Sequence, residues 1–108
     1  MSFKKINMVK DALLTVSENV GHYEAIEKKD KYIVWAEDME GESVHGDGKK
    51  VEQSIQGTID YFTKEDEDPM ADKIQEALTK ADIPFRLSSV QYEEETGYIH
   101  YEWIWEVA

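Results

Sequence analysis

The sequence predicts a single α+β domain, in which a mostly antiparallel sheet carries two helices on one face. Its 108 residues are enough for one hydrophobic core but not for a second lobe. Two segments place apolar residues at helical spacing and four show strand patterns, in the order helix, strand, strand, helix, strand, strand. Strands that occur in pairs between helices are typical of an antiparallel or mixed sheet. We therefore expect one domain over residues 1–108.

The first expected element is a helix over residues 4–19. Gly21 follows it, at a position where a left-handed residue commonly ends a helix. The apolar spacing lasts barely two heptads, so it indicates a core-facing helix rather than a coiled coil. Its apolar residues recur at steps of three and four and are Ile6, Val9, Leu13, Val16 and Val20.

Two strands are expected next. Residues 32–36 are mostly β-branched or aromatic, and large side chains on both faces predict a central strand. Residues 51–64 predict a long, half-buried strand, because several apolar residues fall on odd positions and several polar residues on even positions. The apolar ones are Val51, Ile55, Ile59 and Tyr61, and the polar ones are Glu52, Ser54, Gln56, Thr58 and Asp60. Gly57 in its middle indicates a bulge or a close backbone approach. Between these strands, residues 37–50 contain three glycines and five acids and predict a loop.

A second helix is expected after the acidic residues 65–68. Asp68 can cap it, and Pro69 suits its first turn because a proline lacks the N–H that would be unpaired there. Pro84 is expected to end it, since the residue before a proline is pushed out of helical geometry. The apolar stripe of this helix consists of Ala71, Ile74, Leu78 and Ala81.

Residues 85–107 predict a β-hairpin. The first strand runs through Tyr92, and the turn lies at residues 94–97, where Gly97 can take a positive φ. In the second strand large apolar residues alternate with polar ones, as in a half-buried strand. These apolar residues are Ile99, Tyr101, Trp103, Trp105 and Val107.

The charge and composition exclude several classes of function. Twelve Lys and Arg against 24 Asp and Glu give a net charge of −12, so a face that binds nucleic acid is not expected. The absence of cysteine excludes disulfides, thiolate zinc sites and cysteine nucleophiles. No stretch approaches the roughly 18 apolar residues of a membrane span, and the start lacks a signal-peptide pattern. We expect a soluble intracellular product with no membrane partner.

The residue types that most often perform catalysis or bind metal form no recognisable motif. His22, His45 and His100 lack the helical spacing of a zinc site, and the acids around Gly41 do not match a calcium-binding loop. No serine lies in a nucleophile motif, and there is no glycine-rich phosphate loop. We therefore expect no catalytic residue, metal or cofactor. An enzyme would require one of the three histidines to converge with carboxylates in a cleft.

Acidic side chains gather in three places: the loop of residues 37–50, the run 65–68 and the hairpin tip at 93–95. Such clusters either keep loops soluble or face another polyanion. The acids that we expect to form a channel or docking loop are Asp38, Glu40, Glu42 and Asp47.

The aromatic residues of the sheet are candidates for contacts between subunits. The stripe of Tyr101, Trp103 and Trp105 fits either a core or a binding platform. Together with the aromatic residues of the other face, it exceeds what two helices can cover, so some rings should meet a partner. The residues that we expect in a subunit interface are Trp35, Tyr92, Tyr98 and Trp103.

Three segments carry a resemblance to a known family. They are VEQ at residues 51–53, QGTIDYFTK at residues 56–64 and the closing YEWIWEV at residues 101–107. An acidic turn and a proline-started helix lie between the last two. With these features, nearly the whole chain resembles the small tail completion, or tail terminator, proteins of long-tailed bacteriophages and prophages of Gram-positive bacteria.

The resemblance implies a non-enzymatic structural protein of the virion tail, made in the bacterial cytoplasm. A ring of copies, commonly six, would cap the tail tube and join it to the head. The partners would be further copies, the tail tube protein and the head–tail connector. Double-stranded DNA would pass without being gripped; because it carries one charge per roughly 1.7 Å, an acidic lumen would repel it. Subunits would join through sheet edges and apolar side chains, in heterologous contacts that close by rotation.

The alternative is an acidic inhibitor that mimics DNA and binds a basic nucleic-acid-processing protein. Such an inhibitor would need carboxylates at phosphate-like spacing on one rigid face. The acids here concentrate instead in the expected loops and turns.

Overall fold

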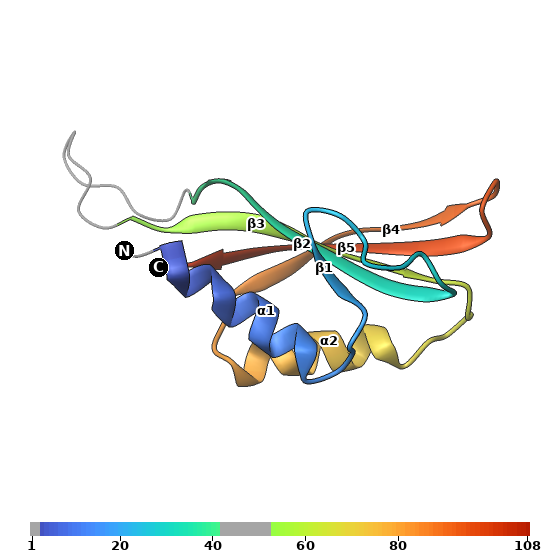
Figure 1. Cartoon of the computed structure of the whole chain (residues 1–108), viewed down its shortest axis with the longest axis horizontal. Coiled ribbons are helices and arrows are strands. Elements are labelled where there is room, and N and C mark those ends of the chain that lie inside the picture. The colour runs from blue at the N-terminus through green and yellow to red at the C-terminus, as the bar shows by residue number, and fades with distance from the viewer. Residues whose placement is uncertain (1–2, 42–52) are drawn as a thin grey trace.

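The computed structural model describes residues 3–41 and 53–108 and confirms the α+β class. A five-stranded sheet in the order β1-β2-β3-β5-β4 has two helices packed on one face (Figure 1). Strands β1 and β2 are parallel, and the other neighbouring pairs are antiparallel. The strands are β1 (Val20–His22), β2 (Lys31–Glu40), β3 (Ile55–Thr63), β4 (Phe85–Glu93) and β5 (Tyr98–Val107). The helices are α1 (Asn7–Leu14), which follows the 3-10 turn η1 (Phe3–Ile6), and α2 (Met70–Lys80).

The core lies between the sheet and the helices. Along β3 every odd-numbered residue from Ile55 to Thr63 is buried and every even-numbered one is half-exposed, as the alternation predicts. Trp35 of β2 and Trp103 and Trp105 of β5, the two strands that flank β3, are at most 1% exposed. Fully burying one aliphatic side chain against them is worth about 1.5–3 kcal/mol. The helices contribute Val9, Leu13, Ile74 and Leu78 to this core.

The first helix is shorter than its apolar spacing predicts. α1 ends at Leu14, where Thr15 bonds back to the Ala12 carbonyl oxygen through its N–H (3.2 Å) and its hydroxyl (2.6 Å). The chain then forms β1, a strand that the sequence did not predict. Val20 faces the core from this strand, so its helical spacing is a coincidence. Gly21 does not end a helix; a Cβ there would lie 2.0 Å from the Glu24 carbonyl oxygen.

The expected loop at residues 37–50 begins later than predicted, because β2 continues to Glu40. Pairing with β3 satisfies the backbone of this polar segment even though its side chains face solvent. The register shifts between Glu37 and Met39, so a bulge falls on β2 opposite Gly57. Gly57 itself is required by close packing: a Cβ there would lie 2.0 Å from the Ala36 carbonyl oxygen and 2.4 Å from the Trp105 ring. The expected close approach is confirmed.

The second helix begins as predicted but ends earlier. The Asp68 carboxylate accepts a 2.9 Å hydrogen bond from the Met70 N–H at the start of α2. At the other end, Asp82 takes a left-handed φ of 57°, and the Ile83 N–H bonds to the Leu78 carbonyl oxygen at 3.0 Å. α2 is therefore ended by a left-handed residue and not by Pro84.

The hairpin of β4 and β5 has the predicted turn. Gly97 has a φ of 79°, and its N–H donates to the Glu93 carbonyl oxygen at 2.8 Å. The far end of this hairpin extends beyond the helices (Figure 1). Within the part of the chain that the structure describes, neither helix has the length and apolarity needed to cross a bilayer.

Candidate functional site

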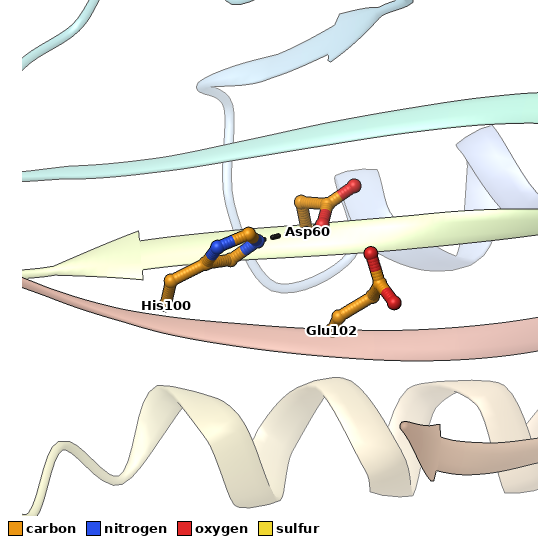
Figure 2. A group of neighbouring side chains, drawn as sticks. All are labelled: Asp60, His100 and Glu102. Carbon is orange, nitrogen blue, oxygen red and sulfur yellow. Dashed lines mark hydrogen bonds and ion pairs between the residues drawn. The ribbon is translucent and has the colours of Figure 1, made fainter. Parts of the chain in front are cut away.

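The face of the sheet opposite the helices, which we call the open face, carries a cluster of one histidine and two carboxylates. Asp60 on β3 lies directly across from Glu102 on β5, and His100 lies two positions along β5. Each of these residues is half-exposed. Figure 2 shows the three side chains projecting to the same side of the two strands. The pairing of β3 and β5 therefore brings together Asp60 and His100, which lie 40 residues apart in the sequence.

The imidazole of His100 is held on three sides. Its Nε2 lies 2.7 Å from Asp60 Oδ1, and its Nδ1 lies 3.5 Å from Glu93 Oε2. Its ring stacks on Phe62, with 4.1 Å between the ring centroids and 19° between the planes. Both nitrogens thus face carboxylates, and the stacking fixes the plane of the ring.

The electrostatics of this cluster favour a shared proton or cation. Burial raises the pKa of Asp60 above its ordinary value; the hydrogen bond from His100 opposes this rise, and the facing Glu102 carboxylate adds to it. Asp60 consequently holds a proton more readily than a solvent-exposed aspartate does. A charge of +1 or +2 placed between the carboxylates would relieve their repulsion.

A cavity of about 340 Å³ adjoins the cluster. It lies between the open face and the connection from β1 to β2, and aromatic side chains form much of its wall. The Tyr98 hydroxyl ties this connection to the sheet by donating to the Lys29 carbonyl oxygen at 2.7 Å. The lining residues that bear on the argument are Tyr23, Lys28, Tyr32, Asp60, Phe62 and His100.

A second histidine also meets a carboxylate, but at the sheet edge. His22 stacks on Trp35 at 4.0 Å, and its Nε2 lies 2.7 Å from Glu37 Oε1. The Tyr23 hydroxyl donates to the other Glu37 oxygen at 2.6 Å. Burial acts to raise the pKa of Glu37, but these hydrogen bonds outweigh that effect. The pKa therefore lies below its ordinary value, and the carboxylate stays ionised. His45 lies outside the described residues.

Of the acids expected in a channel or docking loop, the two that the structure describes, Asp38 and Glu40, do not belong to the cluster. Asp38 and Glu40 are exposed residues of β2, not loop residues. Glu42 and Asp47 lie outside the described residues. The sequence missed the cluster because strand pairing cannot be read from one segment alone. The signal that could have indicated the cluster is that Asp60 and Glu102 both occupy even positions, on the polar faces of their expected strands.

The aromatic residues expected in a subunit interface divide into two groups. Trp35 and Trp103 are each 1% exposed, so the prediction that they are available to a partner is wrong: the helices cover them. Trp103 also donates its indole N–H to Gln75 of α2 at 3.0 Å. Tyr98 is half-buried and bonded to the Lys29 carbonyl, whereas Tyr92 is 64% exposed.

A second surface of interest is the outer edge of β4. Among the described strands β4 pairs only with β5, so its other edge is unpaired. Leu87, Val90 and Tyr92 are 47%, 49% and 64% exposed along it. Their β5 partners are Trp103, Tyr101 and Ile99, which places all three on the helix side of the sheet. We call these three residues and the free backbone of β4 the β4 edge surface.

No protein-family model matches the chain, and no match was found among the curated proteins. The residues and their arrangement are therefore the basis for assigning a function.

Proposed function

We propose that the protein is a non-enzymatic structural component of a phage or prophage tail. Copies of it assemble into a ring at the end of the tail tube and join the tube to the head connector. The observation that carries this proposal is the β4 edge surface. The order of helix, strand pair, helix and strand pair, which is similar to that of the terminator fold, is present with the additional strand β1.

The β4 edge surface has the properties of an assembly contact. It presents a nine-residue strand with unpaired backbone donors and acceptors. Soluble proteins usually protect such edges with charges, prolines or bulges. β4 has a bulge between Leu87 and Ser89, but its residues from Ser89 to Tyr92 carry no charge. Two of the three exposed apolar side chains lie in this uncharged stretch, and burying them would favour association.

The contact is expected to be heterologous. The opposite edge of the sheet starts with β1, which has only three residues, so the two edges differ in length and character. A strand edge that docks on a different surface of the next copy produces a closed ring when the rotation closes. This geometry matches a ring around a tube better than a two-fold dimer.

The negative charge suits a conduit for DNA. The net charge is −12, and exposed acids lie on β2 at Asp38 and Glu40 and at the hairpin tip at Glu94 and Glu95. Carboxylates within about 8 Å of the DNA path would repel it at physiological salt, and more distant ones would be screened. An acidic lumen would let the polymer slide through.

The test is the oligomeric state of the chain, free and on tails. We expect light scattering and native mass spectrometry at micromolar concentration to show a ring, or purified tails to carry several copies at one end. Val90→Lys should abolish both forms of assembly. The matched control is Ile26→Lys, which changes a residue that is 67% exposed on the β1–β2 connection and should assemble normally. A chain that is monomeric both in solution and on purified tails would overturn the proposal.

A further inference from the structure

We propose that Asp60, His100 and Glu102 form a binding site for a divalent first-row transition metal, with Zn²⁺ the best match. The site leaves one coordination position open toward the adjoining cavity. It is independent of the proposed role in tails, because its three ligands lie on the open face and on β3 and β5, and none of them is Leu87, Val90 or Tyr92.

The donor set fits such an ion. It offers one imidazole nitrogen and two carboxylate oxygens, and these atoms all lie within 4.8 Å of one another. Zinc takes nitrogen and oxygen donors at about 2.0–2.2 Å, so tetrahedral donors are separated by roughly 3.3 Å. The present separations, from 2.7 Å between His100 Nε2 and Asp60 Oδ1 up to 4.8 Å, bracket that spacing. Mixed nitrogen and oxygen ligands favour zinc and its neighbours over calcium and magnesium, which prefer oxygen.

The scaffold holds the three donors in place before any ion arrives. All three residues lie on β3 and β5, the two strands that pair along the middle of the sheet. Donors on paired strands are positioned more accurately than donors on loops. The stacking of His100 on Phe62 fixes the imidazole plane and aims Nε2 at Asp60.

An independent observation concerns the other nitrogen of the ring. His100 Nδ1 faces Glu93 Oε2 at 3.5 Å, from the end of β4. In proteins, a histidine that binds metal almost always donates its second N–H to a carboxylate or carbonyl, which sets the tautomer and strengthens the donor. With Nδ1 facing Glu93, the Nε2 lone pair becomes available to the metal once the proton in its contact with Asp60 has left. Binding then displaces the proton that Nε2 and Asp60 share, and this proton goes to solvent.

The cavity supplies the remaining coordination position. Asp60 and His100 both belong to its wall, so an ion between them would face a space of about 340 Å³. Three protein ligands and an accessible fourth position are typical of zinc sites that hold water or an external ligand. A water molecule, or a donor from a docked partner, could complete the tetrahedron.

The experiment uses the full chain, stripped with a chelator and then titrated. Zn²⁺ is followed by competition with a chromophoric chelator, and Co²⁺ by its visible absorption bands, which report the coordination geometry. We expect one equivalent to bind and one proton or more to be released. His100→Gln and Glu102→Gln should each weaken binding by more than 10-fold, and Glu93→Gln by about 10-fold.

Two controls make the result specific. His22 also lies 2.7 Å from a carboxylate, but it is not part of the cluster. His22→Gln should therefore leave the affinity for the metal unchanged. His45→Gln tests binding by the acidic segment at residues 42–52. Far-UV circular dichroism and thermal unfolding establish that each variant is folded; if His100→Gln does not fold, Glu102→Gln decides.

The proposal is overturned if neither Zn²⁺ nor Co²⁺ binds in the micromolar range. It is also overturned if binding survives both His100→Gln and Glu102→Gln, or is lost in His45→Gln. Failure here leaves ring assembly untouched, and Val90→Lys should bind the metal normally even where it fails to assemble.

Discussion

Asp68 shows at the level of one residue how a carboxylate from the acidic run becomes structural. It is 4% exposed and accepts hydrogen bonds from the Tyr61 hydroxyl (2.5 Å), the Thr63 hydroxyl (2.7 Å) and the Met70 N–H (2.9 Å). Burial raises its pKa, but these bonds together with nearby Lys31 lower it below the ordinary value. One member of the acidic run at residues 65–68 thus connects β3 to α2 through hydrogen bonds.

Asp68→Asn should destabilise the fold by about 2 kcal/mol at neutral pH, because hydrogen bonds to a charged acceptor are worth about 1.5–3 kcal/mol each. A lowered folded-state pKa means that the stabilisation is complete above the unfolded value of about 3.9 and is lost as the pH falls through the folded value. Urea unfolding at neutral and acidic pH should therefore show the difference between variant and wild type shrinking in acid. Asp66→Asn, at an exposed neighbour, is the control.

Two glycines should respond to alanine for different reasons. Gly57→Ala should cost about 1–3 kcal/mol or more, because its Cβ would overlap the Ala36 carbonyl oxygen and the Trp105 ring. Gly97→Ala meets no atom within 4 Å, so only its positive φ is penalised, by about 1 kcal/mol. Thermal unfolding distinguishes them, and equal losses would contradict this explanation.

At the scale of the elements, each helix has one buried side and one exposed side. Leu78 of α2 is completely buried, whereas Leu14 at the end of α1 is 47% exposed. Leu78→Ala should destabilise the protein by about 2–5 kcal/mol, through lost burial and the cavity left behind. Leu14→Ala should cost well under that, close to the roughly 0.5 kcal/mol of surface changes. Denaturant midpoints measured for both would contradict this if Leu14→Ala were the more damaging.

The sequence predicted the elements whose pattern is long and regular. β3, α2 and the β4–β5 hairpin follow from alternation, capping residues and Gly97. β1 was missed because three residues are too few to show a period, and parallel pairing with β2 depends on residues that follow it. The end of β2 was missed because its polar residues resemble a loop, although backbone pairing to β3 continues through them.

The candidate site was less predictable than the fold. The sequence identified His100 as one of three histidines to consider and placed Asp60 in an expected strand. Their 2.7 Å contact, however, depends on the β3–β5 register, which sequence patterns do not specify. The interface residues Trp35 and Trp103 were misplaced because the sequence does not show which face of each strand the helices cover. Tyr92 escaped burial because the hairpin extends past the helices (Figure 1).

For the whole molecule, the net charge of −12 makes the compact state sensitive to salt. Self-repulsion between carboxylates reaches about 30 Å at 0.01 M salt but about 10 Å at 0.1 M. The thermal midpoint should therefore rise as salt is added over this range. Replacing both Glu94 and Glu95 by Gln should flatten that rise, and an unchanged slope would show that the hairpin tip contributes little.

The same charge predicts that the protein does not retain DNA. Electrophoresis of a double-stranded fragment with the protein in excess should show no retardation at low or physiological salt, since a net charge of −12 repels phosphates. Retardation that disappears with added salt would reveal a basic face and contradict the conduit.

The position of β5 has a consequence for how the chain is made. β5 lies between β3 and β4 in the sheet but is the last of the described strands to be synthesised. Until it leaves the ribosome, β3 lacks one neighbour, and two of the three core tryptophans are missing. The nascent polypeptide therefore cannot complete its sheet, or the core beneath it, until β5 has been synthesised.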